Sequence, residues 1–490
     1  MTQFDIIRSV FRDLDPAASH EVTTPPDIAE VYTPSDHESA LDADRALVVG
    51  DRGMGKTFWV SALADSSARS YLNQVYSRLK LDLCDVRIGF AGVDMAADGA
   101  ISQEVFDEQE TRKGYRPELI WRAVIFRAAE TAIANSKPMH GTFTELLQWA
   151  DADAERFQSA LRELDRIILA SGRKVVILFD ALDRLGSSWA EIRRRTLALM
   201  RVTLAFRAYS AIRLKIFMRT DQALDPAIFS FPDASKLTQG RVNLSWERRD
   251  LYGLAFSRLV LADPARQAFS DICRESVGFS LDNGANLPNM LKHDEPVQQE
   301  VFSAMAGQYM GSDWRKGKTY AWLHNHLADA HGRVSPRSFL VALGAAARNR
   351  PEPTKVFDPR GLQIGVQAAS EARVNQLAEE FPWIKAALEP LADLRVPATR
   401  ESFIERWDRD DTVKSLVAAS TRVGHLVPVE FGDTPTDATS DQLLQALQRI
   451  GVAETRPDGR INMPDIFRVA SKLLKKGGIP VSSRKGSSVK

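Results

Sequence analysis

The chain has 490 residues, and its 64 lysine and arginine residues balance its 64 aspartate and glutamate residues, so the formal net charge is zero. This length predicts about three domains of roughly 150 residues, and a content of 44% hydrophobic and 26% charged residues is typical of a globular chain with a large core. The zero balance excludes a uniformly basic nucleic-acid coat and an acidic solvating tail, although it leaves room for a charged local surface. The two cysteines, Cys84 and Cys273, have no metal-binding or redox spacing, which argues against a zinc ribbon and a disulfide framework.

Two features of the sequence bear on its location in the cell. The first fifteen residues carry five charges and no apolar core, unlike a secretory signal. The longest apolar stretches, such as 339–347, are about half as long as the roughly 18 residues that a membrane helix needs. We therefore expect a cytoplasmic protein without membrane contact.

From residue 45 onward the sequence predicts a parallel α/β sheet. Apolar runs alternate with stretches of helical periodicity, and this rhythm is typical of a sheet covered by helices on both faces. About eighty residues of mainly helical periodicity, including 118–134, separate the second run from the third and predict a helical insertion, since one crossover does not need that length. The predicted strands are 46–49, 85–93, 174–179 and 214–218.

Beyond residue 240 the strand signals fade and helical patterns replace them. Residues 249–261 and 320–348 predict helices, the second interrupted at Gly332. Three prolines within 350–361 predict a connector. At the other end, residues 1–34 hold a short amphipathic stretch and a Pro-Pro break, and they predict an N-terminal extension.

A glycine-rich motif, GDRGMGKT, follows the first predicted strand and precedes a predicted helix over 56–64. It fits the pattern GxxxxGK[ST], in which backbone N–H groups at a helix N-terminus cradle phosphates. In this interpretation Lys56 neutralises β- and γ-phosphate oxygens, and Thr57 places its hydroxyl on Mg²⁺. The predicted site for ATP and Mg²⁺ consists of Gly50, Asp51, Arg52, Gly53, Met54, Gly55, Lys56 and Thr57.

Two carboxylates follow the third predicted strand. Asp180 ends the apolar run, which is where an acidic residue holds Mg²⁺ beside a P-loop, so Thr57 and Asp180 are the predicted metal-binding residues. Ala181 comes next, where many AAA+ ATPases carry a glutamate. Asp183 is the available substitute, and we expect it to orient or deprotonate the attacking water.

Arginines mark two further positions. Ligands of parallel α/β sheets bind at the carboxyl ends of the strands, so Arg219 or Thr220 is expected near the γ-phosphate, with a surface salt bridge as the alternative. The run 193–195 consists of three arginines, which would form either a finger reaching into a neighbouring subunit or a solvated helix face. The solvated face is favoured, because charge runs on helices usually face water.

Together these motifs resemble the STAND and KAP-like branch of P-loop ATPases, relatives of the AAA+ proteins. The run FDALDR over 179–184 is similar to the NACHT-type pattern hhhhDGLDE, with Arg184 in place of the final acidic residue. Ser335-Pro336-Arg337 is similar to the helix start with which such ATPases place a sensor arginine in a helical lid, and serine and proline suit the cap and first turn. The resemblance covers about residues 35–350. It implies that Arg219 and Arg337 sense the γ-phosphate and that the protein acts in bacterial phage defence, assembling on activation.

Two patterns are not assigned a ligand. Residues 311–319, GSDWRKGKT, end like a P-loop but have five residues between the glycines and no preceding strand, so they predict an ordinary loop. His324, His326 and His331 do not share one helical face, which favours packing or surface roles over a metal site.

The C-terminal region has the pattern of a winged helix. Helical patterns over 412–423 and 440–450 precede a predicted hairpin over 452–463, with Pro-Asp-Gly as its turn. Residues 466–490 contain seven basic residues and no acidic one, so phosphate contacts with a strong salt dependence are expected if this end binds nucleic acid. The alternatives are protein docking, for which winged helices often serve, and a disordered end, since basic chain ends are often disordered.

We expect a regulatory ATPase that binds ATP, hydrolyses it slowly, and uses its nucleotide state to control self-assembly or engagement of an effector protein. One alternative is an initiator-type ATPase that binds duplex DNA through 440–490, and another is a scaffold that nucleotide stabilises without hydrolysis. The expected fold class is an α/β P-loop NTPase sheet with a helical insertion, a helical lid and a C-terminal winged-helix-like domain. The expected divisions are an extension (1–34), an ATPase core (35–240, with an insertion at about 95–172), a lid (241–350), a connector (351–400), a winged-helix-like domain (401–475) and a basic tail (476–490).

Overall fold

The computed structural model describes most of the chain, as two compact units. We call His20–Ser245 the sheet unit, and Met1–Ser19 together with Trp246–Lys490 the helical unit. The residues described are 2–14, 24–28, 31–93, 100–133, 139–281, 286–349, 353–420, 426–432 and 435–481. Among them no helix is long and apolar enough to cross a lipid bilayer.

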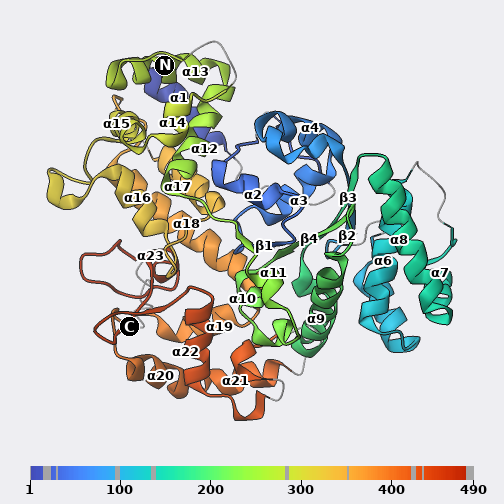
Figure 1. Ribbon diagram of the computed structural model, residues 1–490. Coiled ribbons are helices and arrows are strands. Elements are labelled where there is room, and N and C mark those ends of the chain that lie inside the picture. Colours follow the sequence, from blue (N-terminus) through green and yellow to red (C-terminus); the bar gives the residue numbers. More distant parts are fainter. Residues whose placement is uncertain are drawn as a thin grey trace. The chain divides into compact units, whose positions relative to one another are not determined.

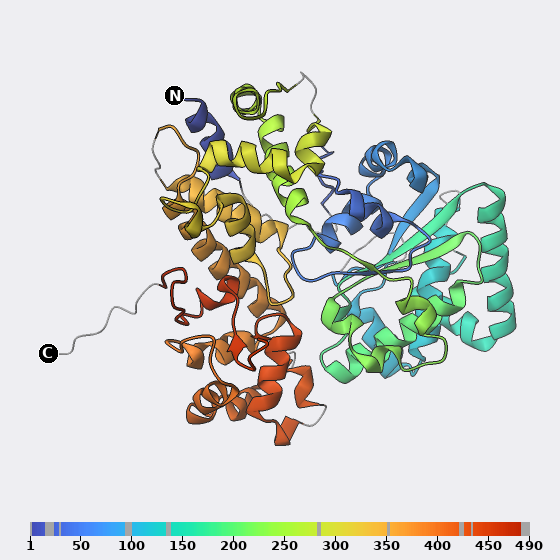
Figure 2. The same cartoon turned by 60° about the vertical axis from the view of Figure 1, so that its left-hand side comes forward.

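The sheet unit is built on five parallel strands. Figure 1 labels β1 to β4, and Figure 2 shows the sheet from another side. Their order is β2-β3-β4-β1-β5, so β4 separates β1 from β3. All the predicted strands are confirmed, and their bounds are Leu47–Val49 (β1), Cys84–Phe90 (β2), Lys174–Phe179 (β3) and Ile212–Met218 (β4). The sequence did not reveal β5, Val242–Asn243, because two residues are too few to produce an alternating or apolar pattern.

Helices cover both faces of this sheet, and β3 shows why. Val175, Ile177 and Phe179 join one core with α6 (Pro117–Ala132) and α9 (Trp189–Phe206), while Val176 and Leu178 are buried on the opposite face. On that second face lies α3 (Lys56–Ala64), the helix predicted over 56–64. A strand buried on both faces must be apolar throughout, which explains the unbroken run KVVILF.

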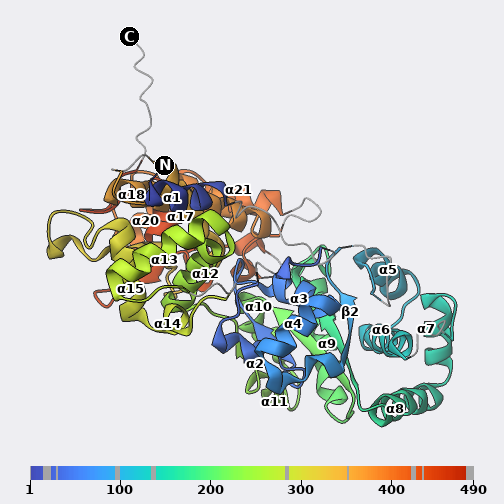
Figure 3. The same cartoon turned by 90° about the horizontal axis from the view of Figure 1, so that it is seen from above.

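The insertion between β2 and β3 is helical, as expected, and gathers at the β2 side of the sheet in Figure 3. Trp121 of α6 anchors it: the side chain is fully buried, packs edge-on against Phe179, and donates a hydrogen bond from Nε1 to the Arg195 carbonyl at 2.9 Å. The insertion therefore shares its core with the sheet. Its helices are α5 (Gln103–Asp107), a π-helical turn (Glu108–Arg112), α6, α7 (Phe143–Ala152) and α8 (Ala154–Ala170).

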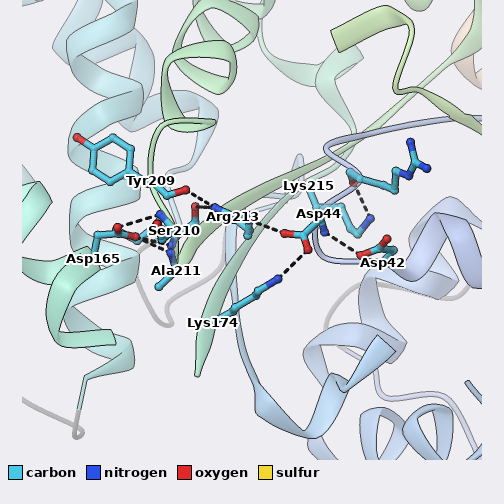
Figure 4. Close-up of polar contacts among 11 residues, drawn as sticks. Asp42, Asp44, Asp165, Lys174, Tyr209, Ser210, Ala211, Arg213 and Lys215 are labelled. Carbon is cyan, nitrogen blue, oxygen red and sulfur yellow. Dashed lines mark hydrogen bonds and ion pairs between the residues drawn. The ribbon is translucent and has the colours of Figure 1, made fainter. Parts of the chain in front are cut away.

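A polar cluster around one buried lysine lies beside the amino ends of the strands (Figure 4). Lys215 of β4 is 0% exposed, and its Nζ donates to the Arg45 carbonyl at 2.8 Å. Nearby, the Asp44 carboxylate pairs with Lys174 Nζ at 2.7 Å and with Arg213 Nε at 2.6 Å. Burial lowers the pKa of Lys215 to about 7, and the neighbouring carboxylates only partly oppose that effect.

The helical unit contains the predicted helices as α12 (Arg248–Leu261), α16 (Thr319–Leu327) and α17 (Pro336–Arg348). Helix α1 (Gln3–Asp13) packs against α17 and α13 (Asp263–Val277). Phe11 of α1 contacts the Phe357 ring at a centroid distance of 5.3 Å. The apolar side of the N-terminal extension therefore has a partner about 350 residues away in sequence, as the Thr2–Pro353 hydrogen bond also shows.

The prolines of 350–361 do not produce the expected connector. Pro359 occupies the first turn of α18 (Pro359–Glu380), with Asp358 as its N-cap, because a proline in that position costs no hydrogen bond. Helix α18 packs along α17 so closely that a Cβ on Gly365 would collide with the Ala342 carbonyl. Residues 351–400 thus contain a central helix of this unit, although the division at 401 itself stays a prediction.

The C-terminal region has the predicted helices and hairpin. Helices α20 (Arg400–Arg409), α21 (Thr412–Ala419) and α22 (Ser440–Arg449) precede the antiparallel pair β6 (Glu454–Thr455) and β7 (Ile461–Asn462). Ala398 exchanges two backbone hydrogen bonds with Ile461, of 2.9 and 2.7 Å, and so adds a third strand-like segment. The remaining elements here are α19 (Ile384–Leu388) and α23 (Asp465–Arg468).

Candidate nucleotide-binding site

The glycine-rich loop connects β1 to α3. Gly53 and Gly55 have φ values of 80° and 96°, a region that side chains with a Cβ avoid, so these two glycines let the loop turn over the N-terminus of α3. Gly50 is needed for a different reason, because a Cβ there would lie 3.1 Å from the Leu244 side chain. Lys56 Nζ donates to the carbonyls of Gly50 and Asp51 at 2.7 and 2.9 Å, which holds the ammonium over the loop.

Thr57 and Asp180 come together at the carboxyl ends of the strands. Thr57 Oγ1 donates a hydrogen bond of 2.9 Å to Asp180 Oδ2, although 123 positions separate the two residues. The Asp180 amide donates to the Phe90 carbonyl at 2.9 Å, which fixes the carboxylate at the end of β3. Burial raises the pKa of Asp180, while the Lys56 ammonium counteracts part of the rise.

Asp183 does not follow Asp180 on the strand. Ala181 has a φ of 53°, an uncommon conformation for alanine, and the chain then turns into a 3₁₀ helix over Leu182–Arg184. This turn presents Asp183, whose side chain is 24% exposed, to Arg219 with an Nη1–Oδ2 distance of 3.5 Å. The structure therefore brings the predicted water-activating carboxylate next to the predicted sensor arginine.

Arg219 follows β4 and has a second carboxylate partner that the sequence did not predict. Arg219 Nε and Nη2 donate to the two oxygens of Asp221 at 2.9 and 2.7 Å, and both side chains are buried. Neighbouring Thr220 begins the short helix α10 (Thr220–Ala223). Asp221 stands two residues after Arg219 in the sequence, but the sequence does not show that the two side chains meet. The turn at the start of α10 brings them together.

The remaining arginines differ from the expectations in part. Arg337 lies in the first turn of α17, which Ser335 caps by accepting a hydrogen bond from the Ser338 amide. It belongs to the helical unit, and its role as a γ-phosphate sensor stays a prediction. Arg195 corrects the solvated-face interpretation of 193–195: it is 1% exposed and pairs with Glu110 of the insertion at 2.6 Å. Arg193 and Arg194 form ion pairs with Asp225 and Glu110 at 2.7 and 2.8 Å.

A buried histidine, His37, forms a hydrogen bond with α3, the helix that follows the P-loop. His37 accepts a hydrogen bond of 3.1 Å from Trp59 Nε1 of α3 at Nδ1, so its Nε2 carries the proton and donates to the Ser245 carbonyl at 2.9 Å. Burial lowers the pKa of His37 to about 4, which keeps the ring neutral near pH 7. Sequence reasoning missed this residue, because one histidine outside a motif gives no signal.

The chemistry of the loop suits the phosphates of a nucleotide with a divalent cation. The N-terminus of α3 and Lys56 supply positive charge, and the paired Thr57 hydroxyl and Asp180 carboxylate are oxygen ligands of the kind that Mg²⁺ prefers. Strand order adds to this, because ligands of open α/β sheets bind beyond the carboxyl ends of the strands. The sheet unit has a P-loop NTPase fold.

Comparison with known proteins gives only remote likenesses. No protein-family model matches the chain, and no curated protein matches it. Among solved structures, the Walker-type ATPase PABY2304 of Pyrococcus abyssi is similar with a TM-score of 0.40 at 11% identity, covering 90% of this chain and 96% of that one. The Aeropyrum pernix ORC2 protein, in ADPNP–ADP complexes, is similar with a TM-score of 0.29 at 12% identity, covering 95% of this chain and 98% of its own.

A structure of the Aeropyrum pernix ORC1 protein in complex with DNA is also similar, with a TM-score of 0.31 at 15% identity, and the match covers 94% of this chain and 93% of that one. Identities this low, at TM-scores below those of a shared overall fold, transfer no ligand, partner or reaction to this chain. The fold assignment therefore stands on the strand order and the P-loop described above.

Proposed function

We propose that the chain is an ATP-binding, slowly hydrolysing regulatory ATPase of STAND- or AAA+-like type. The observation that carries this proposal is the 2.9 Å hydrogen bond from Thr57 to Asp180 beside the P-loop lysine. Mg²⁺ bound there would shield the phosphate charges and polarise the γ-phosphoryl group. Lys56 and the loop amides would bind the phosphates, and Thr57 and Asp180 would hold the metal.

Slow turnover follows from the carboxylate arrangement. A general base must lie within hydrogen-bonding reach of the water that it activates. Asp183 is the next carboxylate along the chain after Asp180 and is the candidate base. It forms an ion pair with Arg219 at 3.5 Å. A carboxylate engaged by a guanidinium is less free to position a water, so we expect binding to be more effective than hydrolysis.

The same arrangement supports a switch. Arg219 contacts two carboxylates, and a γ-phosphate would compete with them for the guanidinium, so ATP and ADP would leave Arg219 with different partners. We propose that this difference, together with Arg337 in the first turn of α17, controls self-assembly or the binding of an effector protein. We propose, on the resemblance of the motifs to STAND proteins, that this switch acts in bacterial phage defence.

The test uses the full-length chain. Calorimetry would measure ATP and ADP binding with and without Mg²⁺, and phosphate release would measure turnover, for the wild type, Lys56→Ala and Asp183→Asn. Lys56→Ala should abolish binding, whereas Asp183→Asn should keep affinity and lower turnover by about 100-fold, the contribution of a positioned base. Exposed Lys236 and Asp151 supply the matched controls Lys236→Ala and Asp151→Asn.

Three outcomes separate the alternatives. Undiminished nucleotide binding in Lys56→Ala would contradict the proposed site. Tight binding without any turnover in the wild type would instead identify a nucleotide-stabilised scaffold. Turnover near 10 s⁻¹, about the median for enzymes, would contradict slow hydrolysis. Light scattering with ATP or ADP would test assembly, and phage challenge of a bacterial host carrying the gene should give protection that depends on Lys56.

A second candidate function is duplex-DNA binding through a winged-helix-like domain, which would make the chain an initiator-type ATPase. It is favoured by the order of elements: three helices, then a hairpin whose β7 pairs both with β6 and with the segment at Ala398. Of the basic residues after 465, Arg484, Lys485 and Lys490 lie outside the described part of the chain. Arg468 is unsuited to phosphate contact, because it is 1% exposed and bound to Asp465 at 2.6 Å.

Duplex binding through this region is testable with exposed residues. Lys476 and Arg456 are both exposed, and Arg456 precedes the Pro-Asp-Gly turn of the hairpin. If the region grips duplex phosphates, Lys476→Ala with Arg456→Ala should lower the salt slope of binding by about 1.8, roughly 0.9 for each phosphate that a cation no longer neutralises. A slope equal to that of the wild type would assign the region to protein docking.

A further inference from the structure

We propose that the loop between α15 (Glu295–Ala306) and α16 binds single-stranded nucleic acid by stacking an unpaired base on Trp314 while its basic residues contact the phosphates. This loop belongs to the helical unit, and it shares no residue with the P-loop or with the winged-helix-like region. It coincides with the run 311–319, which ends like a P-loop in sequence but forms no strand–loop–helix phosphate site.

Trp314 is exposed to an unusual degree. Its side chain is 70% exposed, whereas Trp59, Trp121, Trp383 and Trp407 are fully buried. A large aromatic ring in water forgoes the stabilisation that burial of its surface would give, so the exposed ring is available to a partner. Indole rings stack on every nucleobase, because each base offers a π face.

The loop that carries Trp314 is braced. Tyr309 and Lys318 form an antiparallel bridge, and the Met310 amide donates to the Gly317 carbonyl at 2.9 Å. At the tip, Asp313 caps a 3₁₀ turn by accepting from the Arg315 amide at 2.9 Å. The loop projects from the body of the helical unit in Figures 1 and 3, in yellow. A loop whose backbone is already ordered loses little conformational entropy when its ring stacks on a base.

The charge around the ring selects the partner. Arg315, Lys316 and Lys318 are exposed, and no carboxylate in the described part of the chain forms a salt bridge with them. Asp313 is the one acidic residue of 311–318, so the loop has a net charge of +2. The Arg315 guanidinium lies 5.7 Å from the Trp314 ring centroid, which places a cation beside the stacking surface.

Nucleic acid fits these features better than a protein or a lipid surface. Gly311, Ser312 and Lys316 belong to the same loop and are also exposed, so the apolar surface is confined to a single aromatic side chain. A protein interface core or an interfacial membrane anchor buries a larger apolar face. One aromatic ring with several cations is instead the combination with which proteins hold single strands.

The experiment measures fluorescence anisotropy of a labelled oligothymidylate of about 20 nucleotides, a length that spans one or two single-strand sites. The full-length protein would be compared with Trp314→Ala, Trp314→Phe and Lys316→Ala/Lys318→Ala. Trp314→Ala should weaken binding by about tenfold or more, and Trp314→Phe should keep most of the affinity, since its ring still stacks. The lysine pair should lower the salt slope by about 1.4, roughly 0.7 for each phosphate that a lysine neutralises on a single strand.

Two further measurements exclude an indirect effect. Met139→Ala removes another exposed apolar side chain, 66% exposed, and should leave binding unchanged. Base stacking should also quench part of the fluorescence of the nine tryptophans, and Trp314→Phe should abolish that quenching while the oligonucleotide stays bound. A structural role for Trp314 would not move this signal.

The proposal is overturned if Trp314→Ala binds oligothymidylate as well as the wild type does, or if the wild type binds none at low salt. It is equally overturned if Trp314→Ala weakens only a matched duplex, or if it instead reduces binding to vesicles of phosphatidylserine and phosphatidylcholine. The protein could also bind duplex DNA in a way that does not depend on Trp314. If oligothymidylate binding depends on Trp314 in that case, the loop is a single-strand site distinct from the duplex site.

Discussion

Arg219 and Asp221 face each other in a two-point contact, with Nε–Oδ1 and Nη2–Oδ2 distances of 2.9 and 2.7 Å. Only 6% of Arg219 and 8% of Asp221 are exposed, so solvent screens the pair weakly. Two-point arginine–carboxylate pairs are among the stronger charge-assisted contacts. The arginine predicted to sense the γ-phosphate is therefore already neutralised by a residue of its own chain.

Removing this competition should change nucleotide preference. In Asp221→Asn, Arg219 keeps a hydrogen-bond acceptor but loses the balancing charge, so we expect the ratio of ATP to ADP affinity to rise several-fold. Arg219→Ala should bring the ratio close to one. Calorimetric titration of each variant with ATP and with ADP measures this directly.

A melting curve must accompany the Asp221 titration, because loss of one partner of a buried ion pair costs roughly 3–5 kcal/mol of folding free energy. Asp221→Glu, which retains the charge, serves as the conservative control. An unchanged ATP to ADP ratio in folded Asp221→Asn would show that the pair is structural.

The Thr57 hydroxyl should set the metal dependence of nucleotide binding. Thr57→Val keeps the shape of the side chain but removes the donor to Asp180, so Mg²⁺ should strengthen ATP binding less than it does in the wild type. Thr57→Ser keeps a hydroxyl and should behave like the wild type. Titration of ATP over a series of Mg²⁺ concentrations gives the readout, and equal Mg²⁺ dependence in Thr57→Val would remove Thr57 from the predicted metal site.

Lys215 should make the folding stability depend on pH above neutrality. Its pKa is about 7 in the folded chain against 10.5 when exposed, so unfolding takes up a proton between these values. The free energy of unfolding contributed by this group therefore rises with pH, by at most about 1.4 kcal/mol per unit between pH 7 and 10. Below pH 7 both states hold the proton, and the slope disappears.

Denaturant unfolding at pH 7, 8 and 9 checks this sign. Lys215→Met fills the buried position without a charge, so its free energy of unfolding should not rise with pH. Its gain in stability over the wild type should be largest at pH 7. Lys174→Met, in which a partly exposed ammonium is removed, should keep the slope. Parallel pH profiles for the wild type and Lys215→Met would mean that Lys215 stays charged in the folded state.

Arg468 and Lys476 should separate stability from phosphate binding in the C-terminal region. Arg468 donates to Asp465 and to the carbonyls of Leu473 and Ile479, so Arg468→Met should cost about 3–5 kcal/mol by leaving Asp465 buried without its guanidinium. Lys476→Met, at an exposed position, should leave the unfolding midpoint within experimental error. Thermal unfolding of both variants compares their unfolding midpoints. Equal midpoints would show that Arg468 does not stabilise the fold.

Much of the sheet unit could be predicted because its signals are local. The composition of KVVILF alone predicts a buried parallel strand, and the motif from Gly50 to Thr57 predicts both a turn and the start of a helix. The pairing of Thr57 with Asp180 also follows, since parallel strands bring their carboxyl ends to one edge.

Other features depend on contacts between distant segments and leave no local pattern. Arg195 looked like a solvated charge until Glu110 of the π-helical turn supplied its partner. The prolines before α18 resembled those of a connector, because a proline that starts a helix and one that interrupts a chain look alike in sequence. The sequence also does not predict that Trp314 is exposed, since exposure is a property of the folded surface.

The helical unit is assembled from both sides of the sheet unit in sequence, and this has a consequence for synthesis. A ribosome releases α1 more than two hundred residues before α13 and α17, against which it packs. The sheet unit is thus complete while the apolar side of α1, with Ile7 and Phe11, still lacks its partner. This order makes α1 a binding site for chaperones during translation and the last piece to dock, so a chain stalled before residue 263 would expose it permanently.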